Sequence, residues 1–288
     1  MLKGILCVIG ASLLFGLIPS ASKFLLLTGS TPALITMRTQ TVIMAGGIIG
    51  SLLSGASLKI PVKDALQLML VGALGMGGTS FFLVEAISMI PAGLATVLHF
   101  LYPTIVSVVM IVFFRQKAGI FKFLAVAASI LGMILISGPG GGGIRFGGIV
   151  FALLSAMTYA SYIIYNDVGP AGQYPQTVKL AWCAFGTVLV FAFLARKELF
   201  FIPEGIAPLL VQLAGGVASL AAFYLINRGI REVGASVASF VNMFEPVTSV
   251  IVSFLLYHDP LTVRIVAGIL LVLSAVLFVA VGDRRENA

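Results

Sequence analysis

Two stretches of the chain repeat each other and decide the fold: Ala92–Phe114, AGLATVLHFLYPTIVSVVMIVFF, and Ala235–Tyr257, ASVASFVNMFEPVTSVIVSFLLY. A shift of 143 positions places Pro103 of the first stretch on Pro246 of the second. Each stretch is long enough to cross the hydrocarbon core of a bilayer, which takes about 20 apolar residues. We interpret them as two related membrane helices, each with a proline near its middle.

The composition of the whole chain agrees with a membrane protein. Of its 288 residues, 60% are hydrophobic and 9% are charged, and the mean hydropathy is +1.15. A soluble domain carries about 25% charged residues. No soluble core could bury this much apolar surface, so lipid must be the main solvent of the side chains. Because no long polar segment interrupts the chain, we predict one all-α integral-membrane unit.

The apolar residues fall into ten segments that are long enough to be membrane helices. They cover residues 3–27, 32–54, 65–90, 92–114, 120–138, 146–166, 176–195, 206–228, 234–257 and 262–282. Five lie in residues 1–138 and five in residues 146–288. The repeat extends beyond the opening pair, because a shift of 144 positions places Phe15 on Tyr159. Because five is odd, the second copy enters the membrane in the opposite sense. The sequence predicts ten transmembrane helices as a 5+5 inverted-topology repeat, which is typical of secondary transporters.

No stretch has the pattern of a cofactor site. Residues 139–145 lie between the two halves and continue a glycine-rich run. This run lacks the lysine and the serine or threonine of a phosphate-binding loop, so we interpret it as a flexible link. Cys7 and Cys183 each stand alone in an apolar segment, which argues against a disulfide or a metal site. We therefore expect no cofactor.

The positive charges predict the orientation of the chain. The net charge of +7 comes from lysines and arginines scattered at segment ends, so we expect no nucleic-acid partner. With a cytoplasmic N-terminus, eleven of them would face the cytoplasm and five the outside. The positive-inside rule then favours a multi-pass protein of the cytoplasmic (plasma) membrane with both termini in the cytoplasm.

Polar side chains precede both central prolines. His99 aligns with Asn242 and Tyr102 with Glu245, and the two residues of each stretch are three positions apart, on one helical face. Four polar groups from two related helices would thus converge, and we take them as candidate substrate-binding residues. For His99 the competing interpretation is a hydrogen bond that ties helices together. Tyr102 and Asn242 could line a pore without binding a specific solute.

Glu245 is the sharpest of these candidates. It lies near the centre of its segment, where a charged side chain costs at least about 2.5 kcal/mol on insertion scales. It should therefore face a cavity or a partner, as a substrate-binding or coupling residue. The competing interpretation is a carboxyl group that bonds to backbone freed by Pro246, because proline donates no helical hydrogen bond.

Four further residues within the segments are candidates. Arg38 could hold a substrate carboxylate through two hydrogen bonds or pair with an internal acid. Glu85, whose repeat partner is Arg228, is either a coupling or gating residue or a solvated residue near the interface. Tyr159 and Tyr162 are three positions apart and could form an aromatic wall for a solute.

The pattern resembles the EamA-type branch of the drug/metabolite transporter superfamily. The matching features are an aromatic in the first helix of each half, an early arginine, a hydrophobic-Glu-Pro motif and a charged turn before the last helix: Phe15, Tyr159, Arg38, Phe244-Glu245-Pro246 and His258-Asp259-Pro260. The first half departs from the pattern, with Tyr102 in place of the glutamate and Arg115-Gln116-Lys117 at the turn. The resemblance implies ten helices, a central cavity, export or exchange of small metabolites, and a possible homodimer through the peripheral fifth and tenth helices.

These observations predict a secondary transporter, not an enzyme. The buried polar groups fit a small amphiphilic metabolite such as an amino acid, which would cross the lipid bilayer by alternating access, in export or exchange. A multidrug or cationic amphiphile exporter fits the same residues, and a passive channel or membrane scaffold is a further alternative. An enzyme would need a cluster of nucleophile, base or metal ligands, and the two histidines, His99 and His258, lie in different parts of the chain.

Overall fold

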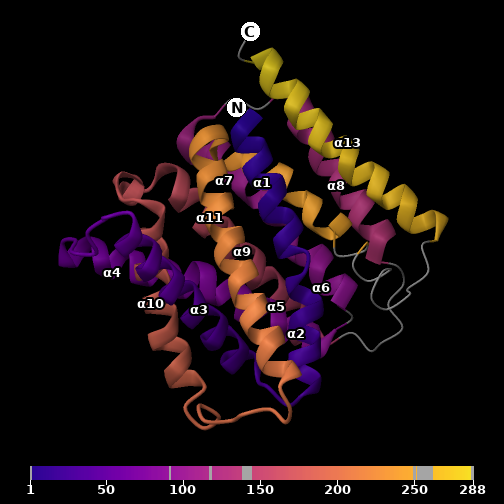
Figure 1. Ribbon diagram of the computed structural model, residues 1–288. Helices are drawn as coiled ribbons and strands as arrows, with labels where there is room; N and C mark the ends of the chain where they lie inside the picture. Colours follow the sequence, from indigo (N-terminus) through magenta and orange to yellow (C-terminus); the bar gives the residue numbers. More distant parts are fainter. Residues whose placement is uncertain are drawn as a thin grey trace.

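The computed structural model of the chain describes residues 2–90, 92–116, 119–137, 145–248, 251 and 262–286. Within these ranges the structure is helical and contains no strand (Figure 1). The predicted glycine-rich link, apart from Arg145, and the turn His258-Asp259-Pro260 lie outside the described residues. An all-helical fold is therefore confirmed for the part of the chain that can be examined.

The elements before residue 138 include three helices that are interrupted or broken. They are α1 (Leu2–Phe15), α2 (Ile18–Leu27), α3 (Pro32–Leu53), α4 (Val62–Val71), the π-helical turn η1 (Gly72–Gly77), α5 (Gly78–Met89), α6 (Ala92–His99), α7 (Tyr102–Phe114) and α8 (Ile120–Ser137). The pairs α1–α2 and α4–α5 each follow one continuous apolar stretch. A break also separates α6 from α7, directly before Pro103.

The elements after residue 145 include a matching break. They are α9 (Phe146–Val168), the 3-10 turn η2 (Pro170–Gln173), α10 (Gln176–Leu194), α11 (Ala207–Val241), the 3-10 turn η3 (Asn242–Phe244) and α13 (Val263–Glu286). Between η3 and residue 248 the chain is helical again. The break at η3 lies directly before Glu245 and Pro246, as the break between α6 and α7 lies before Pro103.

Several of these helices can cross a membrane. Among the described residues, six helical stretches are long and apolar enough, namely Leu2–Leu27, Pro32–Leu53, Val62–Met89, Phe146–Val168, Gln176–Leu194 and Ala207–Thr248. Shorter apolar helices cover Tyr102–Phe114, Phe123–Gly132 and Val263–Ala275. Many large apolar side chains lie on the outside, such as Leu53 at 85% exposed, which suits a surface covered by lipid. The protein is a multi-pass membrane protein.

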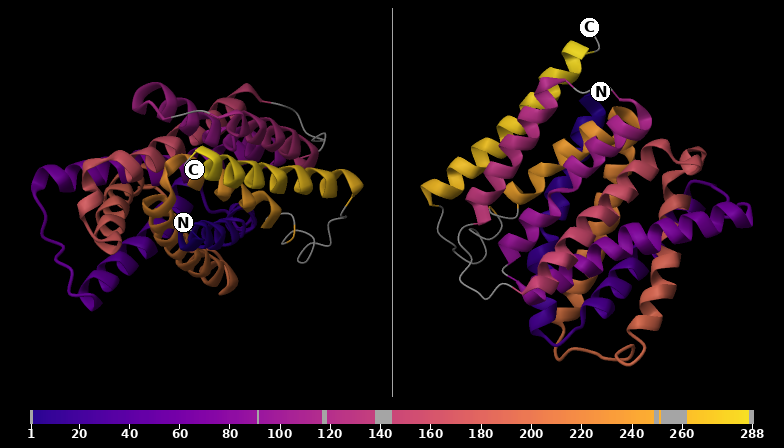
Figure 2. Two further views of the ribbon diagram at one scale, coloured as in Figure 1. Left: turned by 90° about the horizontal axis from the view of Figure 1, so that it is seen from above. Right: turned by 180° about the vertical axis from the view of Figure 1, so that it is seen from behind.

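The helices form one bundle with a helical pair at its side. α1 begins and α13 ends at one end of the bundle, here called the terminal face (Figure 1). α2 ends and α3 begins at the other end, here called the opposite face. α3 packs along α10, α1 along α11, and α5 along α9. α8 and α13 pack on each other at the edge of the bundle (Figure 2).

Local sequence explains where the helices start and break. The hydroxyl of Thr31 accepts a hydrogen bond from the Leu34 amide at 3.3 Å and caps α3, with Pro32 in its first turn. Gly234 has φ of 78° within α11, a conformation that side chains with a Cβ rarely adopt. Just beyond it, the amide of Ala235 donates to the carboxylate of Asp167 at 2.9 Å. That carboxylate from α9 caps the second part of α11, where a helix N-terminus favours negative charge.

Small residues let the helices approach closely. A Cβ on Gly72 would lie 2.0 Å from the carbonyl oxygen of Cys183 in α10. A Cβ on Gly47 would lie 2.7 Å from the Ala181 amide nitrogen. Such contacts are typical of membrane interfaces, where packing replaces the hydrophobic effect.

We expect Gly72→Ala to lower the free energy of unfolding by about 1–3 kcal/mol, because the added methyl group overpacks a contact between helix backbones. Gly215→Ala, at the aligned position, is the matched control, since its Cβ would meet only Ala21 Cβ at 3.9 Å. Thermal unfolding in detergent would compare the two variants with the parent protein. Equal melting temperatures for Gly72→Ala and the parent would contradict this packing.

Candidate functional site

A cavity lies inside the bundle and extends toward the opposite face. It holds about 780 Å³ of atom-free space including its mouth, and the centre of a water-sized sphere can move through about 90 Å³ of it. One water molecule needs about 10–15 Å³ of the space open to sphere centres, so a small solute fits. Its walls come from α2, α3, α5, α9 and α11, the ends of α1 and α6 and the helical residues after η3: Phe15, Ile18, Pro19, Ser22, Ile35, Thr36, Thr39, Thr79, Ser80, Leu83, Val84, Ile87, His99, Tyr159, Ser219, Phe223 and Glu245.

Among the described residues, Glu245 brings the only acidic side chain into this lining, and no lysine or arginine joins it there. Among the described residues, its carboxyl group has no ion pair and no hydrogen bond. A carboxyl group at this depth without a protein partner is costly, and a cationic group of a solute would supply the missing partner. The alternative bond to backbone freed by Pro246 is not found in the described part of the chain.

His99 lines the cavity and also ties two helices together. Its Nδ1 lies 2.9 Å from the hydroxyl of Ser155 in α9, and that hydroxyl donates to the Thr79 carbonyl at 3.0 Å. A hydroxyl has one proton, so both contacts are satisfied only when Nδ1–H of His99 donates to Ser155. The neutral ring then keeps Nε2 as its acceptor. His99 therefore makes the hydrogen bond between helices of the competing interpretation and also lines the cavity. Its role in substrate binding stays a prediction.

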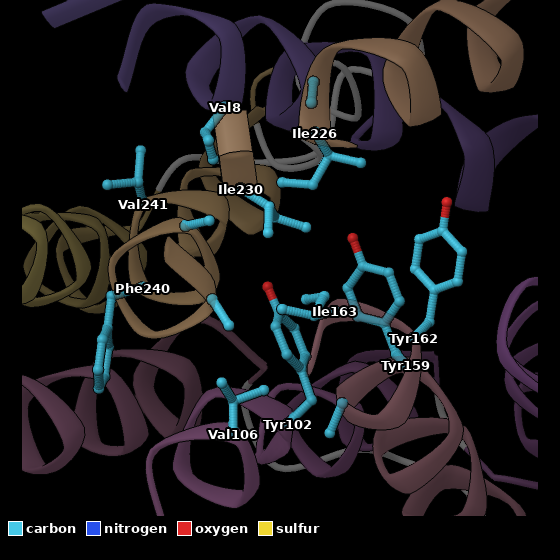
Figure 3. Packing of buried hydrophobic residues seen from close by; sticks show 14 of the residues in the cluster. Val8, Tyr102, Val106, Tyr159, Tyr162, Ile163, Ile226, Ile230, Phe240 and Val241 are labelled. Carbon is cyan, nitrogen blue, oxygen red and sulfur yellow. The ribbon is translucent and has the colours of Figure 1, made fainter. Parts of the chain in front are cut away.

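A polar cluster seals the inner end of the cavity. The amide nitrogen of Asn242 donates to the hydroxyl groups of Tyr102 at 3.0 Å and Tyr159 at 3.3 Å, and the Ser12 hydroxyl lies 3.0 Å from Asn242 Oδ1. The Tyr102 hydroxyl lies 3.2 Å from the Ser239 carbonyl oxygen. We call Ser12, Tyr102, Tyr159 and Asn242 the tyrosine–asparagine cluster. Figure 3 shows the rings of Tyr102, Tyr159 and Tyr162 side by side, with their hydroxyl groups toward α11.

The cluster also lies against a break in a helix. Pro246 has no amide hydrogen, so the carbonyl group of Asn242, four residues earlier, loses its α-helical donor. The backbone N–H of Glu245 donates to this carbonyl oxygen instead and closes the 3-10 turn η3. The Ser12 hydroxyl of α1 lies 3.3 Å from the same oxygen. The break directly precedes Glu245, which lines the cavity.

The structure places the predicted site residues in two groups. His99, Tyr159 and Glu245 line the cavity, and Tyr102 and Asn242 lie directly behind them, with ring centroids of Tyr102 and His99 5.4 Å apart. The remaining three candidates, Tyr162, Arg38 and Glu85, are absent from the lining. The Tyr162 hydroxyl bonds with Asn227, the Arg38 guanidinium donates to the Phe201 carbonyl, and Glu85 is half-buried on α5.

Sequence reasoning missed the hydroxyl groups and one aromatic of the lining. Ser22, Thr36, Thr39, Thr79, Ser80 and Ser219 line the cavity, and the buried Thr36 hydroxyl has no hydrogen-bond partner. Phe15 and Phe223 form an edge-to-face pair with centroids 5.1 Å apart. Their signal in the sequence is weak, because serine, threonine and phenylalanine also occur on many other faces of membrane helices. In the described ranges, no three His, Cys, Asp or Glu side chains gather as a metal ion would require.

Comparison with known proteins identifies the family. The model of the EamA-like transporter family matches residues 2–138 and again residues 146–281. The chain belongs to the EamA-like transporter family. Proteins of similar sequence include an uncharacterized inner membrane transporter, YicL, of Salmonella typhimurium, 27% identical over 78% of this chain and 76% of its own length. An uncharacterized transporter, YvbV, of Bacillus subtilis is 25% identical over 90% of this chain and 86% of its own length.

The fold is also found among solved structures. One crystal structure superposes with a TM-score of 0.82 and covers 98% of both chains at 19% identity. At this identity the likeness concerns the fold alone. The family match by itself indicates a membrane transporter, and the substrate has to be argued from the cavity.

We expect Asn242→Ala to destabilise the protein by about 1–3 kcal/mol, because it removes the hydrogen bond of the buried Tyr159 hydroxyl, whereas Ser12 keeps the Val8 carbonyl at 2.9 Å. Thermal unfolding in detergent measures the loss. Ser161→Ala is the control, because this exposed hydroxyl bonds only to the Met157 carbonyl of its own helix. A melting temperature unchanged by Asn242→Ala would show that the cluster contributes nothing to stability.

Proposed function

We propose that the protein is a secondary transporter that moves a small amphiphilic metabolite, such as an amino acid, across the cytoplasmic membrane by export or exchange. One observation carries this proposal: an unpaired carboxyl group, Glu245, faces a cavity inside the bundle whose lining holds no lysine or arginine. The solute's amino group would bind Glu245. The ring of serine and threonine hydroxyl groups would bind its other polar atoms, and Phe15 and Phe223 its apolar part.

Alternating access is supported by the unequal closure of the two ends. The lining residues of α3, Ile35, Thr36 and Thr39, belong to its first turns at the opposite face, and Ile87 belongs to the last turn of α5 at the same face. The tyrosine–asparagine cluster closes the other end. A passive channel would need a path through both ends, so a carrier that opens one end at a time fits better.

The architecture proposed for this carrier is a ten-helix 5+5 inverted repeat, with halves at residues 1–138 and 146–288 and a link at 139–145. The family matches begin 144 residues apart and end 143 residues apart, in agreement with the repeat in the sequence. The packing of α1 along α11 has its counterpart in α9 along α5. On the same proposal α8 and α13, at the edge of the bundle, would pair two subunits as a homodimer.

A multidrug or cationic amphiphile exporter is the second candidate. The same lining favours it, because one acid, two phenylalanine rings and no basic side chain suit an aromatic cation as well as an amino acid. The two candidates differ in whether the solute must also carry a negative group.

Glu245→Gln is expected to reduce transport about tenfold or more, because a hydrogen bond to a charged group is worth about 1.5–3 kcal/mol. Protein reconstituted in liposomes would be assayed with radiolabelled amino acids and, in a second arm, with the fluorescent aromatic cation ethidium. Glu204→Gln, on an exposed loop, is the control. Full transport of both probes by Glu245→Gln would remove Glu245 from the mechanism. If neither the parent protein nor any variant transports a probe after reconstitution, the carrier function is rejected.

Both termini should lie in the cytoplasm, because the lysines and arginines at segment ends are more numerous on the terminal face. A green fluorescent protein fused to the C-terminus should fluoresce, and alkaline phosphatase fused there should be inactive. The opposite pair of results would invert the orientation.

A further inference from the structure

The lining of the cavity has a counterpart on the terminal side of the bundle. The repeat aligns Ile18 with Tyr162 and Ser22 with Asn166 at a shift of 144 positions. At a shift of 143 it aligns two more lining residues with partners in the second half, Thr36 with Lys179 and Val84 with Asn227. Four lining residues of the open cavity therefore correspond to four buried residues elsewhere in the bundle.

These four buried residues form a hydrogen-bonded group, here called the lysine–asparagine network. Nζ of Lys179 in α10 donates to Oδ1 of Asn166 in α9 at 2.9 Å. The Tyr162 hydroxyl, also from α9, lies 2.9 Å from Oδ1 of Asn227 in α11. The four lining residues border open space, whereas the four residues aligned with them are joined in hydrogen-bonded pairs.

Lys179 is an unusual member of this network. Its side chain is 2% exposed, and no other lysine or arginine whose burial the structure describes is buried. Its hydrogen-bond partner is a neutral amide, and no ion pair with an aspartate or glutamate is found among the described residues. A buried amino group without an acidic partner is costly, and an intramembrane cation of this kind usually serves a substrate or ion path.

We propose that the lysine–asparagine network is the polar lining of a second cavity, which opens to the terminal face when the observed cavity closes, and that Lys179 there binds an anionic group of the solute. The proposal rests on the transport function proposed above and names its substrate class. A carboxylate or phosphate would replace Asn166 as the partner of Lys179, with Asn166 and Asn227 free to donate further hydrogen bonds. Together with Glu245 in the observed cavity, this assigns a zwitterionic solute.

Accessibility of single cysteines to charged thiol reagents tests this without knowledge of the solute. In a Cys7→Ala, Cys183→Ala background, Ile226→Cys reports the second cavity, because Ile226 is buried in α11 beside the tyrosine rings and aligns with the lining residue Leu83 (Figure 3). Leu83→Cys reports the observed cavity. Leu180→Cys is the control for general loosening, because Leu180 is buried next to Lys179 and aligns with no lining residue.

Sealed vesicles of known orientation would receive the membrane-impermeant methanethiosulfonates that carry a sulfonate or a trimethylammonium group. Leu83→Cys should react from the opposite face and Ile226→Cys from the terminal face, while Leu180→Cys stays unreactive. Because labelling is covalent and accumulates, a minor population of molecules open to the terminal face is enough to give a signal. The sulfonate-to-ammonium rate ratio at Ile226→Cys should fall about fivefold in Lys179→Met, as expected from one charge at close range in a medium of reduced dielectric constant. Lys63→Met removes an exposed lysine of the same face and should leave the ratio unchanged.

The outcomes separate this proposal from the transport function. If Ile226→Cys never reacts from the terminal face while the protein still transports in liposomes, the second cavity is rejected and the carrier function is retained. Reaction with a rate ratio that does not depend on Lys179 overturns the anion site. Should Ile226→Cys fail to fold, Val178→Cys, which aligns with the lining residue Ile35, takes its place. Loss of both transport and labelling in every variant rejects carrier and second cavity together.

Discussion

Every backbone polar group that leaves the helical pattern inside a membrane needs a partner from the protein, and this constraint organises the bundle. Pro246 removes an α-helical donor from a membrane helix, and the Asn242 carbonyl oxygen left behind accepts from the Glu245 N–H in a 3-10 turn, with the Ser12 hydroxyl 3.3 Å away. The same hydroxyl meets the Asn242 side chain, which in turn holds the two tyrosine hydroxyl groups of the cluster. One broken helix is thus connected by hydrogen bonds to α1, α7 and α9.

The same 3-10 turn positions the acid at the cavity. Glu245 directly follows the 3-10 turn η3, so the break sets the direction in which its carboxyl group points. Because Asn242 donates to the hydroxyl groups of Tyr102 and Tyr159, these side chains close the bundle behind the cavity instead of extending it. A straight helix at this position would remove both the turn and the reason for the cluster.

Much of this arrangement could be predicted from the sequence, because prolines and polar residues are rare in membrane helices and the repeat pairs them. That pairing predicted the convergence of His99, Tyr102, Asn242 and Glu245. The hydroxyl lining could not be predicted, since serine and threonine satisfy themselves on their own helix and give no facial pattern. The environment of Arg38 also could not be predicted: its partner, the Phe201 carbonyl, is 163 residues away and depends on how a loop folds over α3.

The two halves carry different side chains at aligned positions, and this difference determines which end of the bundle is closed in the more stable state. Opening the terminal side would break the Lys179–Asn166 and Tyr162–Asn227 contacts, worth about 2–4 kcal/mol together when one donor is charged. The aligned positions on the opposite side, Thr36 and Val84, make no such contact, and the Thr36 hydroxyl has no partner at all. A backbone repeat that is nearly symmetric would therefore favour the opposite-open state by enough to leave the other at about 0.1–3% of the molecules. A solute whose anionic group replaces the amide beside Lys179 would recover part of that difference, which makes the return step depend on the solute.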